Sequence, residues 1–370
     1  MSKPRTLALA LGLALSCVIG ASAANDHSSH AFYTAHNLVS DGTVAADHVD
    51  PNLINAWGVA FNPFGFVWVA NNATGTSTLY DGAGVAQSLV VQIPTATTAG
   101  GGPVTGIVFN ASSGFAVKNA TTSAAGRFIF ATEGGVIAAW SPTVDATHAI
   151  RAVDNSAGGA IYKGLALSAG GSGQLLYATD FHNARIDVFD ATFTPVTLPA
   201  GRFSDPKIPS DFAPFGIQAI NGDIYVTYAK QDADKHDNIN GPGLGYVDVY
   251  DPNGVLLDRV ATHGALNAPW GITLAPAGFG EFSNSLLIGN FGDGRINAFS
   301  LKNYSFRGNL RDQSNHSIVI DGLWGLAFGN GFVNQPVNTL FFAAGPNDEA
   351  NGLYGRIDAS ALSGGGDSDD

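Results

Sequence analysis

The chain is poor in cysteine, methionine and charged residues. Its 370 residues include a single Cys and a single Met, and Asp, Glu, Lys and Arg together make up only 13%. Cys17 lies in an apolar N-terminal segment, so the rest of the chain has no disulfide and no cysteine metal site. Its stability must come from burial of apolar side chains, which form 45% of the sequence.

Basic residues are also scarce. There are 17 Lys and Arg against 30 Asp and Glu, which gives a net charge of −13. A chain of this charge repels the phosphate backbone, so nucleic acid is excluded as a partner. An acidic surface suits cation binding or simple solubility.

The common catalytic motifs are missing. The sequence contains no His-Glu-x-x-His zinc motif, no Gly-x-Ser-x-Gly elbow and no glycine-rich phosphate loop. The nine histidines are scattered without the spacing of zinc ligands. No zinc, nucleophilic-serine or nucleotide chemistry is therefore predicted.

The N-terminus has the features of a secretory signal. A basic start is followed by the apolar run Thr6–Gly20 and by Ala21-Ser22-Ala23, which fits the cleavage rule. We predict a signal peptide over residues 1–23 and export to the periplasm or the extracellular space. A lipoprotein site at Cys17 is the alternative, but the apolar run continues beyond it. No other apolar run is long enough to cross a bilayer, so the chain is not predicted to be transmembrane.

One short pattern occurs six times. In each copy an aliphatic residue follows a glycine, and an aromatic residue precedes that glycine in most copies. The spacing averages roughly 53 residues. The glycines are Gly58, Gly106, Gly164, Gly216, Gly271 and Gly325.

Each copy is followed by two or three further strand-like segments with turn residues between them. Four strands repeated six times predict an all-β fold, a six-bladed β-propeller with four-stranded blades. Each blade is a thin sheet that buries its faces against its neighbours. The repeated glycine fits the crowded innermost strand, where another side chain would clash.

The last copy lacks an outer strand, and residues 34–39 before the first copy offer one. We expect this N-terminal strand to pair in the last blade and close the ring. The predicted organisation is therefore a signal peptide over 1–23, a flexible segment over 24–33, the propeller over 34–360 and a disordered acidic Gly/Ser tail over 361–370.

Several of these segments carry a family resemblance. Trp270-Gly271, Trp324-Gly325 and Gly294-Arg295-Ile296 look like NHL-type propeller repeats. Over residues 34–358 the chain resembles a family of uncharacterised exported bacterial proteins, many of which carry a PEP-CTERM sorting tail. The resemblance implies export and a propeller, and it implies no activity.

Polar residues follow the second strand of most copies, and the topology brings these strand ends to one face near the axis. Asn71, Glu133, Asp180 and Asn290 would offer oxygen ligands there. Such oxygens suit calcium, with Glu133 and Asp180 supplying charge and His182 acting as a base. The alternative is that these side chains satisfy backbone groups of the loops.

A polar loop and three tryptophans provide the other candidates. Residues 230–238 form the most polar segment, but their spacing does not fit an EF-hand. They could bind a ligand or form a solvated loop. The tryptophans could stack sugars at the channel mouth or belong to the core. The candidate ligand-binding residues are Lys230, Asp232, Asp234, Asp237, Trp57, Trp270 and Trp324.

Two functions fit this sequence. The first is an exported binding module for a small molecule, a glycan or a protein on its loop face. The second is a calcium-dependent hydrolase of the lactone or phosphotriester type. The sequence favours the binding module, because the sixfold pattern explains most of the unusual residues and no catalytic set stands out.

Overall fold

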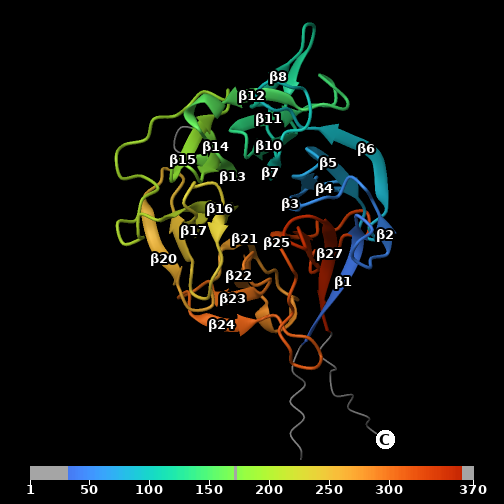
Figure 1. The fold of residues 1–370 in the computed structure, drawn as a ribbon, viewed down its shortest axis with the longest axis vertical. Coiled ribbons are helices and arrows are strands. Elements are labelled where there is room, and N and C mark those ends of the chain that lie inside the picture. Colours follow the sequence, from blue (N-terminus) through green and yellow to red (C-terminus); the bar gives the residue numbers. More distant parts are fainter. Residues whose placement is uncertain (1–31, 171–172, 361–370) are drawn as a thin grey trace, which may run out of the picture.

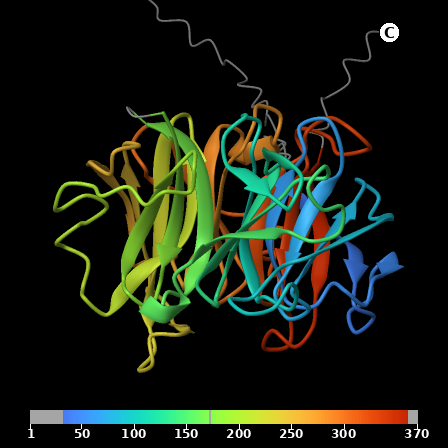
Figure 2. The ribbon, with the colours of Figure 1, turned by 90° about the horizontal axis from the view of Figure 1, so that it is seen from above.

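The computed structural model describes residues 32–170 and 173–360, which form six sheets around a common axis (Figure 1). From the axis outward neighbouring strands run antiparallel, except that β2 pairs parallel with β1 at one outer edge, and the sheets pack side by side as wedges (Figure 2). The predicted all-β, six-bladed propeller is confirmed.

The first three blades follow one another along the chain, and their strands are given from the axis outward. Blade 1 has β3 (Ala56–Phe61), β4 (Val67–Asn71), β5 (Thr76–Tyr80) and β6 (Ala86–Gln92). Blade 2 has β7 (Val104–Phe109), β10 (Phe128–Thr132), β11 (Val136–Trp140) and β12 (Ile150–Asp154), with a hairpin of β8 (Ala116–Lys118) and β9 (Ser123–Ala125) after β7. Blade 3 has β13 (Tyr162–Gly170), β14 (Gly173–Asp180) and β15 (Arg185–Asp190), preceded by the 3-10 turn η1 (Ser156–Gly158).

The other three blades complete the circle. Blade 4 has β16 (Phe212–Ile220), β17 (Asp223–Gln231), β19 (Tyr246–Tyr250) and β20 (Leu256–Thr262), and β18 (Asn238–Ile239) extends β17 as a hairpin. Blade 5 has β21 (Pro269–Leu274), β22 (Ser285–Asn290), β23 (Ile296–Ser300) and β24 (Phe306–Asn309), with the 3-10 turn η2 (Gly280–Phe282) after β21. Blade 6 has β25 (Leu323–Phe328), β26 (Leu340–Ala344), β27 (Leu353–Ala359) and β1 (Tyr33–Ser40), and β2 (His48–Val49) pairs with β1.

The N-terminal strand closes the ring. β1 pairs antiparallel with β27, from Tyr33 opposite Ala359 to Ser40 opposite Leu353. Leu38 and Val39 of β1 are buried between blade 6 and blade 1. The predicted closure by an N-terminal strand is therefore confirmed.

Apolar side chains fill the space between each pair of neighbouring blades. Separate buried clusters lie at the six blade interfaces, and a seventh lies on the axis. The repeated glycines allow the innermost strands to approach this closely. A Cβ atom on Gly216 would lie 1.9 Å from the carbonyl oxygen of Trp270, and one on Gly325 would lie 2.4 Å from that of Trp57. No L side chain fits such a gap, which explains the sixfold glycine.

Blade 3 departs from the predicted four strands. Beyond β15 the structure has only a single bridge, between Phe189 and Pro195. The following chain then leaves this edge, because Phe203 packs against Tyr177 of blade 3 and Tyr250 of blade 4. The outer position of this blade is thus only partly covered.

The predicted signal peptide over 1–23 and tail over 361–370 lie outside the described residues, as does the segment 24–33 apart from its last two residues. Among the residues that are described, the structure has no helix with the length and hydropathy needed to span a bilayer.

Candidate functional site

The residue before each repeated glycine lies on the innermost strand at the axis. These six side chains are at most 8% exposed. They are Trp57, Thr105, Lys163, Phe215, Trp270 and Trp324.

Aromatic rings close the axis of the propeller. Trp57 and Trp324 stack with their ring centroids 3.4 Å apart, and Trp270 meets both edge-on. Phe291 stacks on the other face of this group, 4.0 Å from Trp324. The tryptophans that were candidates for sugar stacking are thus part of the core, and their rings are covered by one another rather than exposed.

Lys163 is the only charged residue among the six axial positions. Its Nζ atom lies 2.5 Å from Oε1 of Glu133 and 3.0 Å from Oδ1 of Asp237. It also lies 5.3 Å from the centroid of the Trp57 ring, in a favourable cation–π position. Burial alone would lower the pKa of Lys163, but the two carboxylates outweigh it and raise the pKa above its usual value. The side chain therefore remains a buried ammonium.

Glu133 follows β10 and links the lysine to a wider polar network. Its second carboxylate oxygen accepts a hydrogen bond of 2.8 Å from the Asn72 side chain. Asn55 donates to Oε2 of Glu349 at 2.6 Å and accepts from the indole N–H of Trp324. Glu133 and Glu349 are thus both linked to the axial tryptophans, Glu133 through Lys163 and Glu349 through Asn55.

Glu349 is held by a strained turn. Asn347, Asp348 and Glu349 all have positive φ angles, of 59°, 52° and 65°. Three consecutive non-glycine residues in this region cost free energy, and such strain tends to collect at functional sites. Burial raises the pKa of Glu349, although the hydrogen bond from Asn55 opposes the shift.

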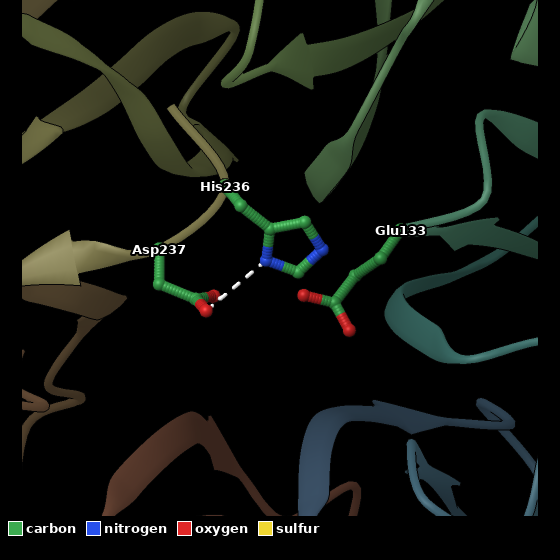
Figure 3. Close-up of side chains that lie close together, drawn as sticks. All are labelled: Glu133, His236 and Asp237. Atoms are coloured by element: carbon green, nitrogen blue, oxygen red, sulfur yellow. Dashed lines mark ion pairs between the residues drawn. The ribbon is translucent and has the colours of Figure 1, made fainter. Parts of the chain in front are cut away.

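The loop between β17 and β18 brings two more groups to the mouth of the channel. Asp232 shapes this loop, because its carboxylate accepts the backbone N–H of His236 at 2.9 Å. The His236 Nδ1 atom then lies 3.1 Å from Oδ2 of Asp237, and the imidazole faces Glu133 (Figure 3). Burial would raise the pKa of Asp237, but Lys163 outweighs burial and lowers it.

The four predicted calcium ligands have separate hydrogen-bond partners. Asn71 donates to Thr76 and Thr78 on β5 of its own blade, while Asn290 donates to the Ala265 carbonyl and to Asp293. None of Asn71, Asp180 and Asn290 hydrogen-bonds to Glu133. The Oδ1 atoms of Asn71 and Asn290 are buried and have no hydrogen-bond partner among the described residues, so a shared calcium site remains a prediction.

Asp180 has its hydrogen-bond partners within blade 3. It is fully buried and accepts hydrogen bonds from the backbone of Ile161 and from the backbone and side chain of Asn183. Its second oxygen also lies 3.4 Å from Arg185. Burial raises its pKa, and all of its acceptor capacity is used inside blade 3.

A different group of metal-type ligands is present at the mouth. Ligand atoms of Glu133, His236 and Asp237 all lie within 4.8 Å of one another (Figure 3). The Lys163 ammonium, however, contacts both carboxylates, and like charges repel. Calcium also prefers oxygen to imidazole nitrogen. These residues do not fit calcium.

The remaining candidates lie apart from this cluster. Lys230 pairs with Asp211 at 3.2 Å, and Asp234 is exposed on the loop. His182 has a buried Nδ1 atom without a hydrogen-bond partner among the described residues, and its role as a base remains a prediction.

No protein-family model matches the chain. One relative is an uncharacterised protein of Acanthamoeba polyphaga mimivirus, 36% identical over 86% of this chain and 78% of that protein. A second uncharacterised mimivirus protein is 32% identical over 88% and 86%. The chain belongs to the same family as these uncharacterised mimivirus proteins. These relatives are viral, so they do not support the bacterial origin that the resemblance implied, and they bear on neither NHL-type repeats nor a sorting tail.

Solved structures share the fold of the family at low identity. Virginiamycin B lyase from Staphylococcus aureus is 14% identical over 89% of this chain and 99% of that chain, with a TM-score of 0.50. The soluble aldose sugar dehydrogenase of Escherichia coli is 11% identical over 88% and 99%, with a TM-score of 0.52. At this identity the likeness shows the propeller fold alone.

Sequence reasoning missed Lys163 as part of the mouth, and it considered His236 only as a member of the polar loop 230–238. A signal for Lys163 was present, because a lysine stands where most copies of the repeat have an aromatic residue. The position of Glu349 depends on a turn that the fold imposes.

Proposed function

We propose that this family member is a binding protein that takes a small molecule with ammonium or hydroxyl groups at the axial mouth. The observation that supports this proposal is the cluster of Lys163 with Glu133 and Asp237. The carboxylates of Glu133 and Asp237 contact one ammonium, and Glu349 adds a third carboxylate that binds Asn55, so the mouth has a surplus of negative charge and of hydrogen-bond acceptors. Asp237 is 61% exposed and can meet a ligand from solvent.

The same cluster argues against a hydrolase. Lys163 stays protonated, so it is no nucleophile. The calcium-dependent alternative needs an ion near Glu133, and there the ammonium already supplies the positive charge. Binding without turnover is therefore the function that these residues support.

Export is a separate part of the proposal. It is supported by the basic start, the apolar run and the small residues up to Ala23. Expression of the full chain in a secreting host, followed by N-terminal sequencing, tests it. A mature protein that begins at Ala24 or within a residue of it is expected.

A matched pair of sugars tests the binding site. Glucosamine and glucose are added to the purified protein, with putrescine as a third probe, and the melting temperature is followed. We expect glucosamine and putrescine to stabilise the wild type more than glucose does, because the mouth favours a positive charge. The Asp237→Asn variant should lose most of this gain, while Asp234→Asn on the same loop should keep it. Equal shifts in both variants, or turnover of a lactone panel, would overturn the proposal.

A further inference from the structure

The outer edge of β15 is open where the other five blades have a further strand. That position is occupied by β6, β12, β20, β24 and β1 in blades 1, 2, 4, 5 and 6. In blade 3 the chain beyond β15 forms two ladder hydrogen bonds to it, from Val196 to Val188 at 2.8 Å and from Asp190 to Thr194 at 2.9 Å, and one turn hydrogen bond, from Phe193 to Asp190 at 2.9 Å. All three lie at the C-terminal half of the strand.

The other half of β15 exposes backbone groups. Backbone directions alternate along a strand, and Val188 and Asp190 face outward, so Ile186 faces outward too. Within residues 32–170 and 173–360 no hydrogen bond reaches the N–H or the C=O of Ile186 on that side. Unpaired edge groups of this kind are a template for another strand.

A groove of about 440 Å³ runs along this edge. One wall is β15 with Pro195 and Val196, and the other is the end of β12 with the η1 turn of blade 2. Ile186, Val188 and Val196 give it an apolar strip. Because walls stand on both sides, the groove admits one extended segment rather than the edge of a second folded copy.

The charged side chains that line the groove indicate the charge of the segment that it would bind. Its lining has two carboxylates, of Asp154 and Asp187, against the one guanidinium of Arg185. Hydrogen bonds from Ser156 lower the pKa of Asp154, so this carboxylate is ionised at neutral pH. A segment with lysine or arginine complements this lining, and the net charge of −13 on the chain acts in the same direction.

We propose that this groove binds a basic, extended peptide segment of a partner protein as the fourth strand of blade 3. The segment pairs with Ile186, next to the point where Val196 occupies the edge at Val188, and places apolar side chains over the strip. Its paired length is short, because only the half of β15 from Arg185 to Asp187 is open. This is strand addition to a sheet edge, in which main-chain bonds give affinity and alternate side chains give specificity.

A proline at the open position provides the decisive variant. Ile186→Pro removes the outward N–H and leaves the ladder to β14 intact, because proline is tolerated where the N–H of an edge strand faces solvent. Ile186→Ala shortens the side chain and keeps that N–H, so it is the matched control. Both variants should melt within a few degrees of the wild type.

The probe is a phage-displayed library of random twelve-residue peptides, selected on the wild type and counter-selected on Ile186→Pro. We expect enriched peptides with alternating apolar and basic residues and no proline. Synthesised peptides should bind the wild type and Ile186→Ala within about threefold, and Ile186→Pro at least tenfold more weakly. In hydrogen exchange, the amide of Ile186 should exchange fast in the free protein and be protected with peptide bound.

Three results would overturn the proposal. One is a library that yields no peptide able to distinguish Ile186→Pro from the wild type. Another is a slowly exchanging Ile186 amide in the free protein, which would show that the edge is already paired. The third is a wild-type dimer that Ile186→Pro dissociates, since a second copy would then fill the edge. None of these results bears on ligand binding at the axial mouth.

Discussion

At the scale of single residues, Lys163 determines the chemistry of the axial mouth. An ammonium that is 1% exposed costs free energy unless carboxylates meet it, and Glu133 and Asp237 do so. Glu133 needs the lysine in turn, since its carboxylate is only 13% exposed.

Removal of the ammonium should therefore destabilise the protein. We expect Lys163→Met to lower the free energy of unfolding by about 3 kcal/mol, because breaking a largely buried pair leaves a charge unpaired. The double variant Lys163→Met/Glu133→Gln should recover part of this loss. Urea denaturation of the four proteins of the cycle measures the coupling. If Lys163→Met lowered the free energy of unfolding by under about 0.5 kcal/mol, as an ordinary surface substitution does, the result would contradict a buried ion pair between Lys163 and Glu133.

Glu349 gives the mouth a pH dependence. Its pKa is raised in the folded protein, so the unfolded chain ionises first as the pH rises above the usual value of 4.5. The folded state is thus penalised above that pH. Relative to wild type, Glu349→Gln should gain stability as the pH rises from 4 to 7, and the exposed neighbour variant Asp348→Asn should not. Thermal melts across this pH range test the sign, and a gain on acidification would refute it.

At the scale of elements, the innermost strands depend on the lack of a side chain at six positions. We expect Gly216→Ala to cost roughly 3 kcal/mol, the upper end for overpacking, because its Cβ would meet the Trp270 carbonyl oxygen. Gly158→Ala is the control, since nothing lies within 4 Å of a Cβ there. It should change the free energy of unfolding by under about 0.5 kcal/mol. Similar losses for both variants in urea denaturation would argue against the close approach.

The pairing of β1 with β27 can be tested by an engineered disulfide. Thr34 lies opposite Asp358 in this ladder, and no cysteine occurs after Cys17. We expect Thr34→Cys/Asp358→Cys to form a disulfide on oxidation and to raise the melting temperature. Thr34→Cys/Arg356→Cys joins positions two residues out of register and should oxidise poorly. Efficient oxidation of the second pair alone would contradict the observed register.

At the scale of the whole molecule, the sixfold glycine pattern was sufficient to predict the propeller, and the missing outer strand of the last copy was sufficient to predict its closure by residues 34–39. The glycine of each copy lies where two innermost strands approach closely, and the sequence shows such a position directly as a repeated glycine. The directions of the side chains at the strand ends could not be predicted in this way. Strand order placed Asn71 and Asn290 at strand ends on one face, but their side-chain directions depend on partners such as Thr78 and Asp293. The open edge of blade 3 likewise follows from where Phe203 packs.

The crystal structure of the mature protein, grown with 10 mM calcium chloride, tests the nature of the axial mouth most directly. We expect the Lys163 ammonium between Glu133 and Asp237, with no ion among Glu133, His236 and Asp237. A calcium ion bound to these carboxylates, with Lys163 turned away, would contradict the proposed binding site and restore the calcium-dependent hydrolase.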